Sequence, residues 1–105
     1  MRMLMRVSIP VESGNSAVKA GTLGSTIERL VADLKPEAVF FYADDDGQRS
    51  GSIIFDMKDS SQIPAAAEPW FLALNAKVSF RPVMTPQDLA KAGPAIAKAA
   101  KQTAK

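Results

Sequence analysis

The chain has 105 residues, 47% of them hydrophobic, which is typical of one globular domain and excludes a wholly disordered chain. It has no cysteine and no histidine, which excludes disulfide bonds, thiolate nucleophiles and metal sites built on sulfur or imidazole. The net charge of +2 is uneven: residues 86–105 carry four lysines and one aspartate, and residues 1–85 carry −1. This distribution argues against nucleic acid as a partner, because nucleic-acid binding needs a basic stripe on a folded surface.

The first strand is predicted over residues 3–9, where apolar positions alternate with mixed ones. One face would carry Met3, Met5, Val7 and Ile9, and the other Leu4, Arg6 and Ser8. Arg6 interrupts the apolar run early and no small-residue cleavage site follows, so we expect no signal peptide. No apolar stretch approaches the length that crosses a bilayer, and the lack of cysteine fits the cytoplasm, where we expect the protein.

A helix is predicted within residues 11–35, ending before Pro36. Its second half repeats apolar residues at helical spacing, namely Leu23, Ile27, Leu30, Val31 and Leu34. Glycines at three positions leave its first half uncertain. A strand rich in aromatic residues, AVFFYA, follows over residues 38–43, and a second strand-like run covers residues 53–57.

The stretch YADDDGQRSGS, residues 42–52, poses a choice between a metal site and a turn. A helix-loop-helix calcium loop with Gly47 as its fixed glycine would place its first and last ligands at Tyr42 and Ile53. Neither residue has a carboxylate, and the flanking segments indicate strands. Asp-Gly is a strong hairpin signal, since both residues tolerate left-handed backbone angles. We therefore predict a hairpin turn and no metal site.

A second long helix is predicted after Lys58, with Ser60 or Ser61 as its cap and Pro64 in its first turn. Pro69 predicts a kink or a broken first turn. The predicted buried stripe consists of Ile63, Ala67, Trp70, Phe71 and Leu74.

A strand over residues 77–83 is predicted next, because apolar and polar positions alternate again. Thr85 would cap a last helix with Pro86 at its first position, and Gly93-Pro94 would interrupt it. We expect residues from about 90 to 105 to form a weakly helical, frayed and solvated tail.

The order of elements is the split β-α-β-β-α-β pattern of the ferredoxin-like fold. We therefore predict a single α+β domain over residues 1–105, with a four-stranded antiparallel sheet in strand order 4-1-3-2. Two helices would cover one face of the sheet, and a C-terminal helix would follow.

The second face of this sheet is predicted to be half apolar, which is unusual for a face open to water. It would include Leu4, Arg6, Ser8, Ile54, Asp56, Ser79 and Arg81, while the strand at 38–43 is apolar on both sides. The simplest explanation is a homodimer in which this face packs on the same face of a second copy.

Four stretches together make up about half of the chain: IPVESGN (9–15), KPEAVFFYADDDGQR (35–49), FDMKD (55–59) and AEPWFLALNAKVSFRPVMTPQDL (67–89). They resemble a family of small uncharacterised bacterial proteins of the dimeric α+β barrel group. The resemblance implies the ferredoxin-like fold and the dimer, and it assigns no catalytic residue. The broader group includes cofactor-free monooxygenases, lactone isomerases, haem-degrading enzymes and binding or regulatory domains, and the fold does not choose among them. Since the chain has no histidine to hold haem iron, we expect no cofactor.

Arg6, Asp56 and Arg81 are predicted to cluster on neighbouring strands. One interpretation is a cationic pocket for a small carboxylate, with arginine as a fork-shaped donor. The interpretation that we favour is an arginine–aspartate network across the dimer interface. Arg49, which follows the turn, is expected to lie in solvent, and the lysines of the tail are expected to be solvated as well.

Tyr42, Trp70 and Phe71 are candidates for the lining of an apolar cavity. Because Trp70 and Phe71 fall on the buried stripe of a helix, ordinary core is the favoured interpretation for both. Glu68 would be a candidate general base if it were buried beside such a cavity, and the same holds for Glu12.

Asn15, another polar residue near the end of a predicted element, is expected to cap the first helix.

We favour a homodimeric domain that binds a small carboxylate or an apolar ligand, or that serves as an accessory protein. The alternative is a cofactor-free enzyme, monooxygenase- or isomerase-like, acting in the cleft between sheet and helices. A cleft filled by Trp70, Phe71 and Leu34 would exclude this alternative.

Overall fold

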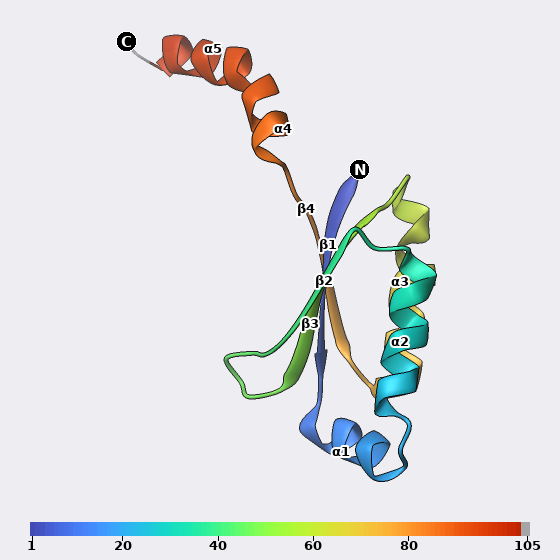
Figure 1. The fold of residues 1–105 in the computed structure, drawn as a ribbon. Coiled ribbons are helices and arrows are strands. Elements are labelled where there is room, and N and C mark those ends of the chain that lie inside the picture. Colours follow the sequence, from blue (N-terminus) through green and yellow to red (C-terminus); the bar gives the residue numbers. More distant parts are fainter. Residues whose placement is uncertain (104–105) are drawn as a thin grey trace.

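A four-stranded antiparallel sheet forms the centre of the computed structural model, which describes residues 1–103 (Figure 1). Its strands are β1 (Arg2–Ile9), β2 (Ala38–Ala43), β3 (Arg49–Asp56) and β4 (Lys77–Pro82). The strand order is β2-β3-β1-β4, which is the predicted 4-1-3-2 order counted from the opposite edge. The predicted ferredoxin-like α+β fold is therefore confirmed.

The alternation along β1 separates the two faces of the sheet. Met5 lies opposite Ile53 and Phe80, whereas the adjacent Arg6 lies opposite two serines. The apolar face is buried under helices, and its core includes Met3, Met5, Val7, Ile9, Leu30, Ile53, Phe55, Met57, Trp70 and Leu74. We call the other side the open sheet face; it includes Leu4, Arg6, Ser8, Phe40, Tyr42, Ser52, Ile54, Ser79 and Arg81.

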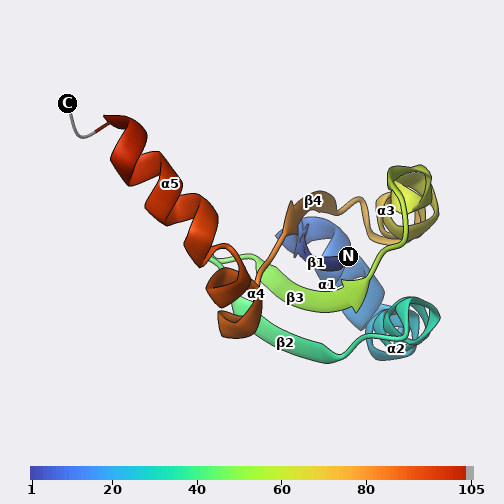
Figure 2. The same cartoon turned by 90° about the horizontal axis from the view of Figure 1, so that it is seen from above.

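Three helices, α1 (Val11–Lys19), α2 (Leu23–Leu34) and α3 (Ile63–Leu74), lie on the side of the buried face. α2 and α3 cover the sheet, and α1 lies where β1 ends (Figures 1 and 2). The predicted helix at 11–35 is thus two helices. The chain turns between them at Gly21, whose φ of 74° lies in the left-handed region that glycine adopts without strain.

The predicted serine cap is replaced by an aspartate cap on a short 3-10 helix that precedes α3, and α3 itself begins after Gln62 without a side-chain cap. The Asp59 carboxylate, rather than a serine hydroxyl, accepts a hydrogen bond from the backbone N–H of Ser61, at 2.9 Å, in the short 3-10 helix η1 (Ser60–Gln62). Aspartate is as good a cap as serine, and here it stands one residue earlier. Pro64 lies in the first turn of α3, as predicted, and the helix continues through Pro69 without a break.

The buried stripe of α3 is narrower than predicted. Ala67, Trp70 and Leu74 are buried, whereas Phe71 is 39% exposed and Ile63 is 36% exposed. Because each residue of a helix turns by about 100°, Phe71 lies on the flank of α3 when its neighbour Trp70 faces the sheet. The prediction that Phe71 belongs to the core is therefore wrong.

The aspartate-rich stretch forms the predicted hairpin turn between β2 and β3. The backbone N–H of Asp44 donates to the carbonyl of Gln48, and Gly47 donates back to the carbonyl of Asp44. Gly47 has a φ of 75°, which explains why glycine follows the aspartates.

A helical arm, made of α4 (Pro86–Lys91) and α5 (Gly93–Thr103), follows β4. It leaves the sheet on the side opposite α2 and α3 (Figures 1 and 2). Thr85 caps α4 as predicted and forms a capping box with Asp88. The predicted interruption at Gly93 is also present.

The arm makes the molecule elongated, with extents of 62 × 28 × 21 Å. Its radius of gyration is 17.7 Å, whereas about 13 Å is expected of a compact chain of this length. The segment predicted as a frayed tail is helical as far as Thr103, and the expectation for residues 104–105 lies outside the described residues. No helix within residues 1–103 combines the length and apolar character needed to span a bilayer.

Candidate functional site

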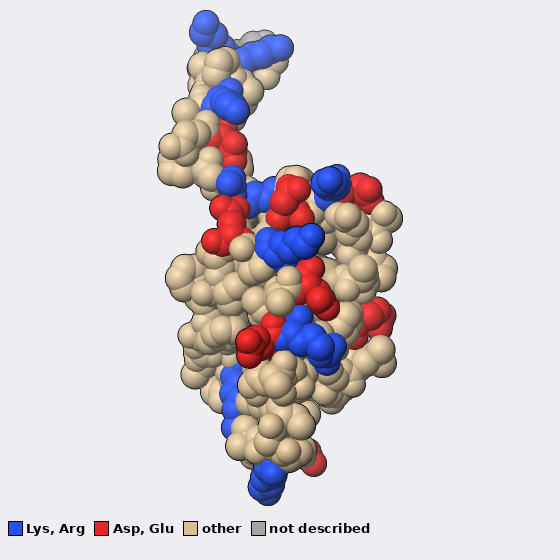
Figure 3. Space-filling model, turned by 45° about the vertical axis from the view of Figure 1, so that its right-hand side comes forward, with Lys and Arg blue, Asp and Glu red and all other residues tan. Residues whose placement is uncertain are grey.

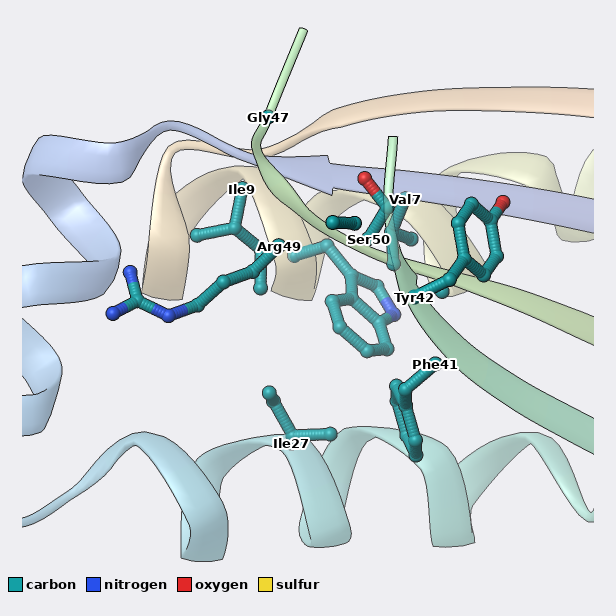
Figure 4. A pocket seen from close by; sticks show the side chains of 11 residues that line it. Val7, Ile9, Ile27, Phe41, Tyr42, Gly47, Arg49 and Ser50 are labelled. Atoms are coloured by element: carbon teal, nitrogen blue, oxygen red, sulfur yellow. The ribbon is translucent and has the colours of Figure 1, made fainter. Parts of the chain in front are cut away.

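A cleft of about 410 Å³ lies between the sheet and α2, near the hairpin end of β2 and β3 (Figure 4). We call it the Trp70 cleft, because the buried Trp70 of α3 is among the residues that line it. Ile27 of α2 and Phe41 of β2 face each other across it. The rest of the lining comes from Val7, Ile9, Tyr42, Ala43, Gly47, Arg49, Ser50 and Gly51.

The cleft is not filled by the three side chains that the sequence suggested for this space, namely Leu34, Trp70 and Phe71. Phe71 lies on the flank of α3, and Leu34 lines a separate hollow beside Asp56 and Gln62. Of the three, Trp70 alone lines the cleft. The cleft is therefore open to a ligand.

Trp70, which lines the cleft, carries a hydrogen-bond donor. The residue is only 1% exposed, yet its indole N–H donates to no side chain or backbone group of residues 1–103. No polar side-chain atom among these residues is sealed from solvent without a partner, so the indole nitrogen keeps a small contact with solvent. An acceptor atom of a ligand would replace water at this N–H, since a tryptophan N–H usually finds a partner when it is buried.

Arg49 is the cation of the Trp70 cleft, and it is only partly in solvent, where the sequence predicted a solvated residue. The pairing of β1 with β3 sets Arg49 opposite Ile9, on the buried face, and the residue is half-buried. Its guanidinium extends towards α1, away from Phe41 and Tyr42 (Figure 4). There its Nη2 donates to Oδ1 of Asn15 at 3.1 Å.

Gly14 makes room for this arginine. A Cβ atom built on Gly14, which is buried within α1, would collide with Nη1 of Arg49. Asn15 lies inside α1, where it accepts a hydrogen bond from the guanidinium of Arg49. The prediction that Asn15 caps this helix is therefore wrong. The cap position of α1 is occupied by Pro10, which offers no side-chain hydrogen bond.

Gly51 plays a similar part at the other end of the cleft. A Cβ atom there would lie 3.2 Å from the ring of Phe41, so glycine lets this ring lie across β3. Phe41 and Ile27 also line a second, more open apolar groove of about 590 Å³ between α2 and β2, with Leu23, Val31 and Val39. Apolar surface thus continues from the Trp70 cleft along the edge strand.

The predicted cluster on the open sheet face is only partly formed. Arg6 donates from Nε to the Tyr42 hydroxyl at 3.2 Å, and that hydroxyl is 2.7 Å from Oγ of Ser52. Arg81 lies opposite Leu4, two residues along β1 from Arg6. Asp56, however, is not brought to this pair.

Asp56 binds the chain terminus instead. The N-terminal ammonium donates to its Oδ1 at 2.8 Å, and this hydrogen bond, followed by the charge of the amine, lowers the pKa of Asp56. Asp56 lies opposite Arg2 at one end of β1, four positions from Arg6. A network of arginines with Asp56 is therefore absent from the described residues of one chain.

The two candidate bases lie outside the Trp70 cleft. Glu68 is exposed on α3 and contributes to none of the hollows described here. Glu12 is exposed beside a shallow hollow near Pro10 and Asn75.

The residues that sequence reasoning missed are Arg49 and Gly14. The two-residue period of β3 could have shown the first, because Arg49 falls in step with buried Ile53.

Asp44, at the start of the turn, carries the most strongly perturbed carboxylate. Its oxygens accept from the backbone N–H groups of Asp46 and Gln48 and from the hydroxyls of Ser8 and Ser50. These bonds favour the charged form, with Gln48 and Ser8 contributing most, and they lower the pKa of Asp44 to about 2. The carboxylate thus stiffens the turn beside the cleft.

Charges elsewhere are mixed. Figure 3 shows acidic and basic side chains interleaved over the body, with basic groups towards the end of the arm. No group of three or more carboxylate side chains within residues 1–103 is arranged to hold a metal ion. The Trp70 cleft, with its one arginine, is therefore the best-formed candidate site in the described chain.

No protein-family model matches the sequence, and no curated protein matches it. Among solved structures, the fold is similar to part of a formyltetrahydrofolate deformylase from Pseudomonas putida KT2440, with a TM-score of 0.49 and 11% identity. The match covers 79% of this chain and 29% of that one, so the chain spans less than a third of the deformylase. The family suggested by the sequence stays a prediction, and the fold confirms its coarser part, a small α+β domain.

Proposed function

We propose that this chain is a small-molecule-binding domain whose ligand occupies the Trp70 cleft. The observation that carries the proposal is a mostly apolar cavity of about 410 Å³, lined by Trp70, that also has a positioned arginine. Binding sites typically combine a mostly apolar cavity of about 300 to 1,000 Å³ with a few polar groups that orient the ligand. The Trp70 cleft falls within that range.

Binding is better supported than acid–base catalysis. The alternative of a monooxygenase- or isomerase-like enzyme needs a group that takes up a proton near the reacting atom. The described lining of the cleft is mostly apolar, with one guanidinium and no carboxylate, and the carboxylates of Glu12 and Glu68 lie elsewhere. We accordingly assign the cleft a binding role. We place the protein in the cytoplasm as part of this proposal.

The test uses Trp70, the one tryptophan of the chain, as a fluorescent donor. The neutral probe N-phenyl-1-naphthylamine should accept excitation energy from Trp70 when it binds. The transferred fluorescence should saturate at one probe molecule per chain. Ile27→Phe, which narrows the cleft, should weaken probe binding about tenfold or more, corresponding to about 1.4 kcal/mol.

The matched control is Leu72→Phe, since Leu72 is 85% exposed on the outer side of α3. It should bind the probe as the unchanged protein does. Absence of saturable energy transfer, or equal weakening by both substitutions, would contradict the proposed site. Native mass spectrometry of freshly purified protein would reveal any molecule that the cleft retains.

We also propose that two copies pair through the open sheet face. This face exposes apolar groups, with Phe40 at 62% exposure and Leu4 and Ile54 half-buried beside it. Surfaces of this kind mark interaction sites, and twofold dimers are the commonest homo-oligomers. The helical arm leaves the body on this same side, where it would reach the second copy. The mass of the native species tests this pairing.

A further inference from the structure

The Trp70 cleft has two chemically different ends. Phe41 lies at one end, and the guanidinium of Arg49 lies at the other, next to α1 (Figure 4). A ligand that fills the cleft must therefore offer apolar surface along most of its length and a group that suits a cation at one end. This asymmetry restricts the class of ligand more than the volume does.

Arg49 is held in place without a counter-ion. Its bond to the neutral amide of Asn15 engages one of five N–H donors, and no carboxylate of residues 1–103 lies within ion-pair distance of it. The guanidinium therefore keeps donors that can bind an anionic ligand. The guanidinium passes so close to Gly14 that a side chain at this position would force it to move.

We propose that the ligand is an aromatic monocarboxylate, with its carboxylate on Arg49 and its ring against Ile27 and Phe41. One guanidinium matches one carboxylate through two parallel hydrogen bonds. The aromatic side chains favour a flat ring, since stacked and edge-to-face contacts add to the burial of area. This inference rests on the proposed function of the cleft and adds the ligand class to it.

The experiment compares 2-naphthoate with its neutral isostere 2-naphthamide as competitors of N-phenyl-1-naphthylamine. In the unchanged protein we expect naphthoate to displace the probe at a concentration about tenfold lower or more, as expected for a charge-assisted pair. Arg49→Met, which keeps an apolar stem, should bring the two competitors level while probe binding persists. Arg29→Met, an exposed arginine on α2, is the control and should keep the preference.

Gly14→Ala gives a second, independent reading. Alanine suits the interior of a helix better than glycine, so the fold should be kept, while its methyl group displaces the guanidinium of Arg49. The preference for naphthoate should fall in this variant as well. Equal displacement by both competitors in the unchanged protein, or a preference that survives both substitutions, would overturn the ligand class and leave the binding cleft standing. Failure of the probe to bind would overturn both.

Discussion

Asp44 shows how one side chain of this protein couples charge to structure. Its carboxylate receives four hydrogen bonds that tie the β2–β3 turn to the end of β1, and its pKa falls to about 2. A carboxyl group with a lowered pKa stabilises the fold above its ordinary pKa of about 3.8. That stability is lost as the pH falls through about 2, because the protonated form cannot accept all four bonds.

We predict that Asp44→Asn flattens the acid limb of the stability curve. The unchanged protein should lose thermal stability steeply between about pH 4 and pH 2, and the variant, already lacking the charge, should lose less over this interval. The melting temperature of the variant at pH 7 should be several degrees lower. Circular dichroism melts from pH 7 to pH 2 measure both effects.

Asp45→Asn is the control for this prediction, because Asp45 lies in the same turn and is exposed. It should follow the pH dependence of the unchanged protein. If Asp44→Asn and the unchanged protein lost stability in parallel from pH 4 to pH 2, the role assigned to this carboxylate would be wrong.

At the scale of elements, α4 depends on its cap more than on packing. The Thr85 hydroxyl accepts from the backbone N–H of Asp88 at 3.1 Å, and the Asp88 carboxylate accepts from the backbone N–H of Thr85 at 3.0 Å. The helix has only six residues, all exposed or half-buried, and the arm points away from α2 and α3. Short helices without a packed face are marginal in water.

Thr85→Ala should therefore open α4 locally by about 1 kcal/mol. The amide hydrogens of α4 should exchange about fivefold faster, while those of β1 keep their rate, since the sheet does not depend on this cap. Gln87→Ala, in the same turn but outside the capping box, is the control. Uniformly faster exchange across β1 and α4 would mean that the arm supports the whole fold.

Much of this fold could be predicted from single elements. The alternation along β1 fixed which side chains enter the core, and Asp-Gly located the hairpin, because both signals depend on neighbouring residues alone. The site could not be predicted in the same way. Arg49 gains its role from Gly14 and Asn15, which lie more than thirty residues earlier in the chain. Likewise, Asp56 pairs with the N-terminal amine instead of joining the predicted cluster, because the start of β1 lies beside the end of β3.

At the scale of the whole molecule, the open sheet face and the arm share one side. The arm is joined to the body near the first residue of β1, where Nη1 of Arg2 lies 3.7 Å from Oδ2 of Asp88. Beyond this point α5 extends freely, and Leu89 and Ile96 are each more than half exposed. A second copy on the open sheet face would cover apolar groups of both the sheet and the arm.

We predict that Phe40→Glu shifts the protein towards the monomer. A charge at the centre of an apolar interface has no partner there and must be desolvated, so dimer affinity should fall about tenfold or more. Light scattering coupled to size-exclusion chromatography measures the mass as a function of concentration. Leu72→Glu places the same charge on the outer side of α3 and should leave the mass unchanged. A monomer in the unchanged protein at high concentration would contradict the pairing.

The edge strand β2 has one further consequence. Its six residues, AVFFYA, contain no charge, proline or glycine, and Phe40 and Phe41 are each about 60% exposed on opposite faces. Segments of this composition stack into steric zippers when their backbone is free. Glu37 and Asp44 flank the strand as gatekeepers, and β3 pairs with one of its two edges. The aromatic pair that suits β2 to hold a ligand and a second copy thus makes it the segment from which cross-β fibrils would start in unfolded protein.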